Sequence, residues 1–265
     1  MVDLTSVGFD RWVRGVMRDP ETHDVYWSID QIEQASINAT QENDNVVDAL
    51  GTPVAQLGRA KSLALGGQNA FFDFALLGAQ FGTEVEKSDA TKTFEAPSFE
   101  KFNVTSGTTT VSLAHHPNGI GAAGIPFVYR MTNNQLVEKF AYAADASATE
   151  FTFSDMELTV PTGFTGTLFV IYKYNANDTD VVRRISNQAE KYPKTGEFIA
   201  ECIFFDLCNE NIKYYGYCEL PNSKLDGNFD VNLARDGKHP FNINAMQKYC
   251  DNEKVLCNFY IPADK

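Results

Sequence analysis

The amino-acid sequence predicts a mainly β protein: an antiparallel β-sandwich or barrel with one principal α-helix packed on it at about residues 69–82. The first observation behind this prediction is that short apolar segments recur at short, regular intervals through most of the chain, as in antiparallel β-proteins. The second is that one stretch, after a double glycine, changes to the spacing of an amphipathic helix. Because such a helix buries its apolar stripe against another element, we expect it to pack on the sheet.

Two strands are predicted immediately before the helix, at Val46–Leu50 and Pro53–Leu65. In the turn between them, Gly51 supplies an unrestricted φ and Pro53 a fixed one. We expect Gly66-Gly67 to end the second strand, because glycine has no side chain to pack on a pleated surface.

Five apolar residues predict the helix, because they fall three, four and seven apart and therefore share one face: Phe71, Phe72, Ala75, Leu76 and Ala79. Asn69 stands where an N-cap residue is expected, and Asp73 in the first turn is favourable for the helix dipole. Gly82 is expected to end the helix.

The N-terminal region is expected to contain three further segments of the sheet. Residues 8–17 have two faces of mixed character, which indicates an edge strand or an arm. The segments DVYWSI and QIEQASINATQEN are predicted strands, the second with a polar end, and residues 41–45 a loop.

The remainder of the chain is predicted to be strands joined by short turns. TGTLFVIYKYNA is the most apolar segment and should run through a core. The last strands are expected in GEFIAECIFFDLC, NIKYYGYCELP, NFDVNLARDG, HPFNINAMQKYC and VLCNFYIP. We interpret residues 1–265 as a single β-domain, with a possible inserted or elaborated β-unit at about 98–190.

Charge and hydropathy exclude several classes of protein. The formal net charge is −13, which argues against a partner bound by neutralising phosphates. No apolar run reaches the length of a membrane span, and the N-terminus lacks a positively charged segment followed by an apolar one. We therefore expect assembly in a cytoplasm, without a membrane partner.

The sequence offers no catalytic, cofactor-binding or metal-binding constellation. The four histidines, at positions 23, 115, 116 and 239, are expected to be solvated loop or surface residues. No phosphate-binding glycine loop or nucleophile elbow is present. We therefore predict no enzyme activity, no cofactor and no metal.

The five cysteines all lie in the last quarter of the chain and lack the C-x-x-C spacing of zinc sites: Cys202, Cys208, Cys218, Cys250 and Cys257. On a continuous strand Cys202 and Cys208 would share a face. Small buried thiols are the favoured interpretation, although a cluster in three dimensions is open, as is oxidation of one pair after release into an oxidising medium.

The order of segments resembles that of the bacteriophage tail tube protein family and related virion structural proteins. The likeness rests on an early WVRG, then WSIDQIEQASIN, VVDALGTPVAQL and KSLAL, and on CELP, FDVNLARDG and FNINAMQKYC near the end. It covers about residues 9–82 and 196–261. The resemblance implies a β-sandwich protomer whose copies form rings of six, stacked into a tube through which the genome passes.

The resemblance also implies partners and a location. The partners are further copies of the chain and other tail proteins such as sheath, terminator or baseplate, while genomic DNA passes without specific binding. The location is the virion tail, after assembly in the host cytoplasm. The hairpin from Asn38 to Gly58 is our candidate contact between rings or subunits, through Asn38, Glu42, Asp44, Asp48, Gly51 and Pro53.

Alternatives from other classes remain open at this point. One is another virion component, such as a head decoration or connector protein. A second is a β-sandwich module that binds a surface or a carbohydrate, which exposed aromatic residues clustered on one face would favour. Trp12 and Trp27 are the two tryptophans available for it. The third is an enzyme without a recognisable motif.

Overall fold

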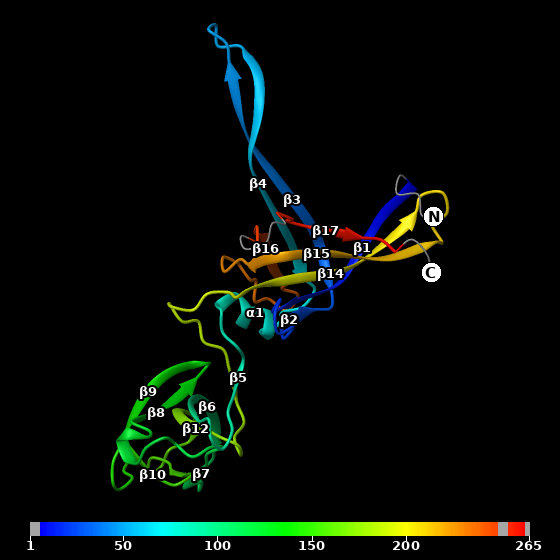
Figure 1. The fold of residues 1–265 in the computed structure, drawn as a ribbon. Helices are drawn as coiled ribbons and strands as arrows, with labels where there is room; N and C mark the ends of the chain where they lie inside the picture. Colours follow the sequence, from blue (N-terminus) through cyan, green and yellow to red (C-terminus); the bar gives the residue numbers. More distant parts are fainter. Residues whose placement is uncertain (1–5, 249–253, 263–265) are drawn as a thin grey trace. The chain divides into compact units, whose positions relative to one another are not determined.

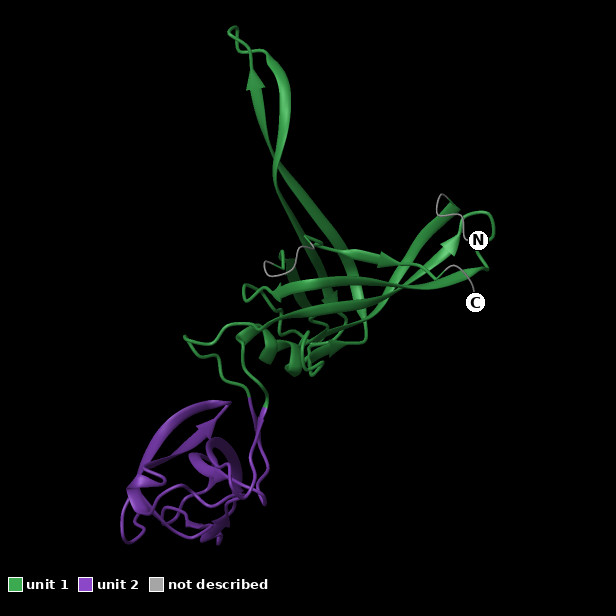
Figure 2. Ribbon diagram, viewed as in Figure 1, with its two compact units in different colours: residues 1–85, 185–265 green, residues 86–184 purple. Residues whose placement is uncertain are grey.

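The computed structural model describes residues 6–248 and 254–262 and divides the chain into two compact units (Figure 2). Unit 1 comprises residues 1–85 and 185–265, and unit 2 comprises residues 86–184. Each unit has its own hydrophobic core. Most described residues are in strands, so the prediction of a mainly β fold with one principal helix is confirmed.

Unit 1 is built on one antiparallel sheet with the strand order β2-β1-β14-β15-β16-β4-β3, to which β17 adds by pairing with β15 (Figure 1). Its strands are β1 (Val7–Arg18), β2 (Val25–Ile29), β3 (Ile32–Val47), β4 (Pro53–Asn69), β14 (Thr195–Asp206), β15 (Lys213–Leu225), β16 (His239–Ala245) and β17 (Asn258–Tyr260). The strand at residues 8–17 is therefore neither an edge strand nor an arm, because β1 is paired on both sides.

The core of unit 1 forms where alternate side chains of distant strands meet on one face. Phe198, Ala200 and Cys202 alternate along β14 and are all buried. The ring of Trp27, from β2, packs 5.6 Å from that of Phe198. Trp12 is buried as well, so neither tryptophan is available on the surface for a binding module.

Helix α1 (Phe74–Phe81) is shorter than the predicted 69–82 and begins at a different cap. Asp73 is the N-cap, and its carboxylate accepts hydrogen bonds from the Ala75 and Leu76 N–H groups at 2.6 and 3.2 Å. Asn69 cannot cap the helix because it is the last residue of β4. Gly82, with φ of 69°, ends the helix as predicted.

Only part of the predicted apolar stripe lies on the helix. Leu76 is buried and Ala79 packs against the same core. Phe71 and Phe72 precede the helix, and Phe71 is exposed. Phe72 instead stacks on the imidazole ring of His239, with 5.1 Å between ring centroids.

The hairpin strands are longer than the sequence predicts. The predicted loop at residues 41–45 lies within β3, and β4 continues through Gly66 and Gly67. Register pairing along the whole hairpin overrides the low strand propensity of these residues. Gly67 has a further reason to be glycine, since a Cβ there would lie 2.8 Å from Cζ of buried Phe241.

Two other predictions in unit 1 are wrong. The described chain has no strand across residues 228–237, where NFDVNLARDG was expected to form one. His239 is fully buried rather than solvated. Its Nε2–H donates to Gln80 Oε1 at 2.8 Å, and its Nδ1 accepts from the Asp73 N–H at 3.2 Å. The neutral ring thereby links β16 to both ends of α1.

Unit 2 is a seven-stranded sheet with the order β6-β12-β8-β9-β10-β11-β7. Its strands are β6 (Phe94–Val104), β7 (Thr110–Ser112), β8 (Phe127–Thr132), β9 (Gln135–Tyr142), β10 (Glu150–Ser154), β11 (Glu157–Thr159) and β12 (Gly166–Ala176), with a 3-10 turn η2 (Gly121–Ala123). As predicted for TGTLFVIYKYNA, β12 runs through the core, where Leu168, Val170 and Tyr172 are buried. The pair β9–β10 is parallel.

The two ends of unit 2 are paired with each other. β5 (Glu86–Lys87) and β13 (Arg183–Arg184) form a short antiparallel ribbon. The Arg184 guanidinium donates to Glu86 through Nε and Nη2, at 2.9 and 2.6 Å. The chain therefore leaves and re-enters unit 2 at one place.

We predict that Gly67→Ala destabilises unit 1 by about 1–3 kcal/mol, because the added methyl group meets the Phe241 ring. Gly66→Ala is the matched control: the nearest atom to its Cβ would be Asn242 Oδ1 at 3.5 Å, an ordinary contact. Urea unfolding followed by tryptophan fluorescence measures the difference, since both tryptophans lie in the core of unit 1. Equal midpoints for the two variants would contradict the packing argument.

We also predict that unit 1 loses stability as the pH falls below about 6.5. Burial lowers the pKa of His239, so over this range the unfolded chain binds a proton that the folded one does not. The loss is at most about 1.4 kcal/mol per pH unit and stops once the pH is below the folded-state pKa. His239→Gln should flatten the pH dependence of the unfolding midpoint; an unchanged slope would exclude His239 as its source.

Candidate assembly surfaces

The hairpin β3–β4 continues beyond the sheet to which it belongs (Figure 1). β4 pairs with β16 only over Leu63–Asn69, whereas β3 and β4 pair with each other as far as Val47 and Pro53. β3 is also the terminal strand of the sheet. Between Ser62 and the turn, each strand of the described hairpin therefore has only the other as a neighbour.

Apolar side chains are exposed along this projecting part. They are Val46, Val47, Leu50, Val54 and Leu57, of which Leu50 is 91% exposed. A two-stranded hairpin without a covering layer is marginally stable in water. Exposed apolar groups gathered on such an element are typical of a surface that contacts another protein.

All six predicted contact residues lie along the hairpin and are exposed, with Asn38 at the level where β4 still pairs with β16 and the other five nearer the turn. Asn38, Glu42 and Asp44 lie on β3, Asp48 and Gly51 in the turn, and Pro53 at the start of β4. Asp48 accepts hydrogen bonds from the Leu50 and Thr52 N–H groups, both at 2.9 Å, and Gly51 has φ of 83°. Asp48 and Gly51 therefore also shape the turn.

Sequence reasoning missed the exposed apolar residues on the same hairpin. The sequence has two valines before the turn and Val54 and Leu57 after it. Two strands half-buried in a sheet would show the same pattern. Only the strand order reveals that no further strand of the described chain pairs with them.

The projecting part of the hairpin carries three acids and, farther from the turn, two basic residues, Arg59 and Lys61. Residues 38–58 contain Glu42, Asp44 and Asp48 and no lysine or arginine. Asp44 is paired with Arg59 at 2.5 Å, but both side chains are exposed, and such a pair contributes little stability. A partner for the tip would therefore be expected to carry basic groups.

The sheet of unit 1 has a second open edge at β2. Among the described residues β2 pairs only with β1, and its Val25 is exposed. Open edges leave backbone N–H and C=O groups available to a strand from another chain. Unit 1 thus presents an open edge on each side and a projecting hairpin on one of them.

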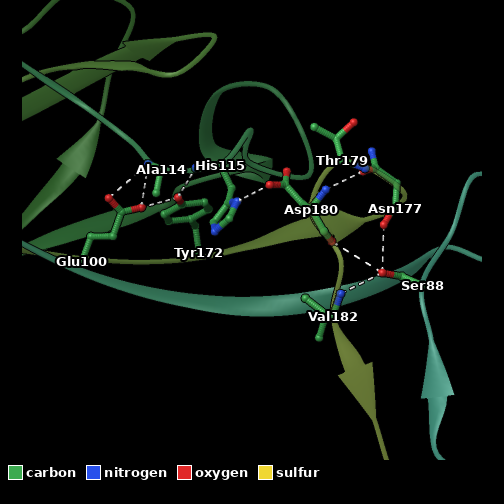
Figure 3. Close-up of polar contacts among 9 residues, drawn as sticks. All are labelled: Ser88, Glu100, Ala114, His115, Tyr172, Asn177, Thr179, Asp180 and Val182. Atoms are coloured by element: carbon green, nitrogen blue, oxygen red, sulfur yellow. Dashed lines mark hydrogen bonds and ion pairs between the residues drawn. The ribbon is translucent and has the colours of Figure 1, made fainter.

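Unit 2 contains a polar network that joins the loop after β7 to the strands beneath it (Figure 3). Glu100 accepts from the Ala114 N–H at 3.1 Å and from the Tyr172 hydroxyl, which itself accepts from the His115 N–H at 3.1 Å. Burial, followed by the bond to Glu100, raises the pKa of Tyr172 to about 12. A tyrosine held in this way serves as a fixed hydrogen-bonding group rather than as an acid or base near neutral pH.

The histidine of this network is also held in place. The His115 ring stacks on Tyr174 with 3.9 Å between centroids, and its Nδ1 lies 3.0 Å from Asp180 Oδ1, without hydrogen-bond alignment. Buried Ser88 donates to the Asn177 carbonyl and accepts from the Val182 N–H, both at 2.9 Å (Figure 3). These bonds tie the first residues of unit 2 to its last, which is a structural role.

Two of the five cysteines are adjacent in space. The sulfurs of Cys218 on β15 and Cys257 before β17 are 3.4 Å apart, and both thiols are free. Their hydrogen bond lowers the pKa of Cys257 and raises that of Cys218. Cys257 is therefore the thiol that ionises first and the better nucleophile.

The other cysteines differ from the sequence prediction in part. Cys202 is buried, and burial raises its pKa to about 12. Cys208 does not share its strand, because β14 ends at Asp206, whose carboxylate accepts from the Cys208 N–H in an exposed turn. Cys250 lies outside the described residues.

Within residues 6–248 and 254–262, no group of three or more histidine, cysteine or acidic side chains is arranged to hold a metal ion. No helix of the described chain is both long and apolar enough to cross a membrane.

These features define a structural β-protein with surfaces suited to contact other chains. The model of the YomU/Tube protein family matches residues 13–256, and the chain belongs to this family. The match confirms the resemblance to phage tail tube proteins at the level of the family, and a family of tube proteins agrees with a structural rather than an enzymatic role. Among curated proteins, none matches the chain.

We predict that diamide, an azo oxidant, converts Cys218 and Cys257 into one disulfide. The two thiols lose two protons and two electrons to the reagent, and the sulfurs need to approach only from 3.4 Å to about 2.05 Å. Peptide mapping by mass spectrometry identifies the pair. Cys257→Ser should abolish it while Cys208→Ser leaves it unchanged; a different dominant pair would contradict the geometry.

Proposed function

We propose that this protein is the protomer of a phage tail tube, in which copies join side by side into rings of six and the rings stack around a channel for the genome. The observation that carries the proposal is the β3–β4 hairpin, an exposed ribbon with apolar and acidic side chains in a member of a tube protein family. In the proposed tube, the hairpin contacts the next ring through the six residues named above.

Two further features support this proposal. The open edges of the unit 1 sheet, β2 and β3, are suited to pair with neighbouring protomers, and ring closure leaves no edge unpaired. The net charge of −13 suits a channel through which DNA slides, because acidic groups repel phosphates. Genomic DNA is accordingly proposed to pass without being bound.

We propose that unit 2 is an inserted β-unit carried on the outside of the tube. The ribbon β5–β13 and the Ser88 bonds bring its two ends together, so the insertion interrupts unit 1 at a single connection between α1 and β14. In this proposal, sheath, terminator or baseplate proteins bind the assembled tube, which is built in the host cytoplasm and ends in the virion tail.

Negative-stain electron microscopy of the purified protein at low and high concentration tests the proposal. Rings or hollow tubes of uniform diameter are expected. A monodisperse monomer at every concentration would overturn the tube function and favour a decoration or connector protein that needs another partner.

We predict that shortening the hairpin abolishes stacking but leaves the fold intact. Because Gln41 pairs with Lys61, replacing Glu42–Ala60 with Asn-Gly gives a two-residue turn in register. The removed residues are all exposed, so the tryptophan unfolding midpoint should stay the same while tubes give way to single rings. Tubes of unchanged length and abundance would exclude the hairpin as the contact between rings.

A further inference from the structure

Two pockets of similar size lie beside α1 in unit 1, and they differ in charge. The first, of about 660 Å³, is lined by three acids, Asp19, Asp24 and Glu84. Its lone basic residue, Lys194, pairs with Glu84 at 3.2 Å. We call this the acidic pocket.

The second pocket, of about 700 Å³, is lined by Lys191 and Lys224 and, among the residues that the structure describes, by one acid, Asp226. Neither lysine forms an ion pair with a described residue. The Asp226 carboxylate is already engaged, because it accepts from the N–H and the side-chain amide of Asn228 at 2.9 and 3.1 Å. We call this the lysine pocket. In a protein of net charge −13, two lysine amines without an ion-pair partner in the described part of the chain form a local basic site beside one cavity.

We propose that the lysine pocket receives the tip of the β3–β4 hairpin from a second copy of this chain. This inference rests on the proposed tube function and names the surface that the hairpin contacts. The acidic tip, with Glu42, Asp44 and Asp48, complements the two lysines. Leu50, the most exposed apolar residue of the tip, meets an apolar wall in which the rings of Phe81 and Phe229 lie 5.7 Å apart.

The tip has to come from another copy, because it cannot reach the pocket of its own chain. The pocket is lined by Asn244 and Met246, at the end of β16. Because the last residue of β16, Ala245, pairs with Leu63 of β4, this part of the pocket lies at the level of Leu63. At about 3.4 Å per residue, the stretch from Leu63 to Pro53 carries the tip roughly 35 Å beyond that level. In Figure 1 the hairpin indeed extends away from α1 and the end of β4.

A contact between the tip of one copy and the body of the next joins two different surfaces. Such head-to-tail contacts do not close on themselves between two molecules, and they propagate into an open stack. The acidic pocket beside α1 is excluded as the acceptor, because Asp19, Asp24 and Glu84 would repel the acidic tip.

Charge reversal in the lysine pocket tests the inference. Lys191→Glu combined with Lys224→Glu should reduce the fraction of protein in stacked tubes about tenfold, while rings persist. Sedimentation together with electron microscopy measures this fraction. The single variant Lys191→Glu has a matched control in Lys194→Glu, which changes the net charge by the same amount. Lys194 lies three residues farther along the same segment, and of the two pockets it lines the acidic one.

A mixing experiment separates a lost contact from a damaged fold. A tip variant, Glu42→Lys with Asp44→Lys, should also fail to stack alone, because like charges then face each other. Mixed with rings of the pocket variant, it should form tubes again, because each tip now meets a pocket of opposite charge.

The outcomes distinguish this inference from the proposed function. If the wild-type protein forms tubes, any of three results would overturn the pocket assignment and leave the tube function standing. The pocket variant could stack like wild type, Lys194→Glu could reduce stacking as much as Lys191→Glu does, or mixing could fail to restore tubes. Wild-type protein that never forms tubes would overturn the tube function, and the pocket assignment with it.

Discussion

The pairing of β1 with β14 is the constraint on which the rest of the structure depends. It joins the first strand of the chain to a strand that follows the whole of unit 2. Closing such a long loop costs little more entropy than closing a shorter one, because the cost grows only with the logarithm of its length. Burial offsets it: Phe198 of β14 lies directly over Gly15 of β1, where a Cβ would come within 2.6 Å of its ring.

The pairing of β1 with β14 explains how unit 1 has both a continuous sheet and open sheet edges. With β1 and β14 both inside the sheet, β2 and β3 are its edges, and the hairpin extends from one of those edges. Unit 2 interrupts the chain between α1 and β14 without entering the strand order of the unit 1 sheet. An inserted unit can therefore vary while the sheet and the hairpin stay unchanged.

Charge is also distributed unevenly between the surfaces of unit 1. A net charge of −13 makes two copies of the chain repel each other, so the proposed assembly needs local attraction where the copies meet. In the contact proposed above, the acidic residues of the hairpin and the lysine-lined pocket of a second copy supply that local attraction. Because exposed charges are screened within about 8 Å at physiological ionic strength, the attraction acts only when the surfaces are close. In the same proposed contact, burial of the exposed Leu50 side chain adds a contribution that salt does not weaken.

The sequence by itself determined the fold class, the helix end at Gly82, the core strand TGTLFVIYKYNA and the hairpin that carries all six candidate contact residues, because these depend on local periodicity and turn chemistry. Only the tertiary structure decided that Asp73 caps α1, that His239 is buried between α1 and β16, and that β4 continues past Gly66-Gly67. It also decided that Val54 and Leu57 have no covering strand and that Lys191 and Lys224 line one pocket. The reason is that each of these depends on strands brought together from distant parts of the chain, and local pattern carries no record of which segments meet.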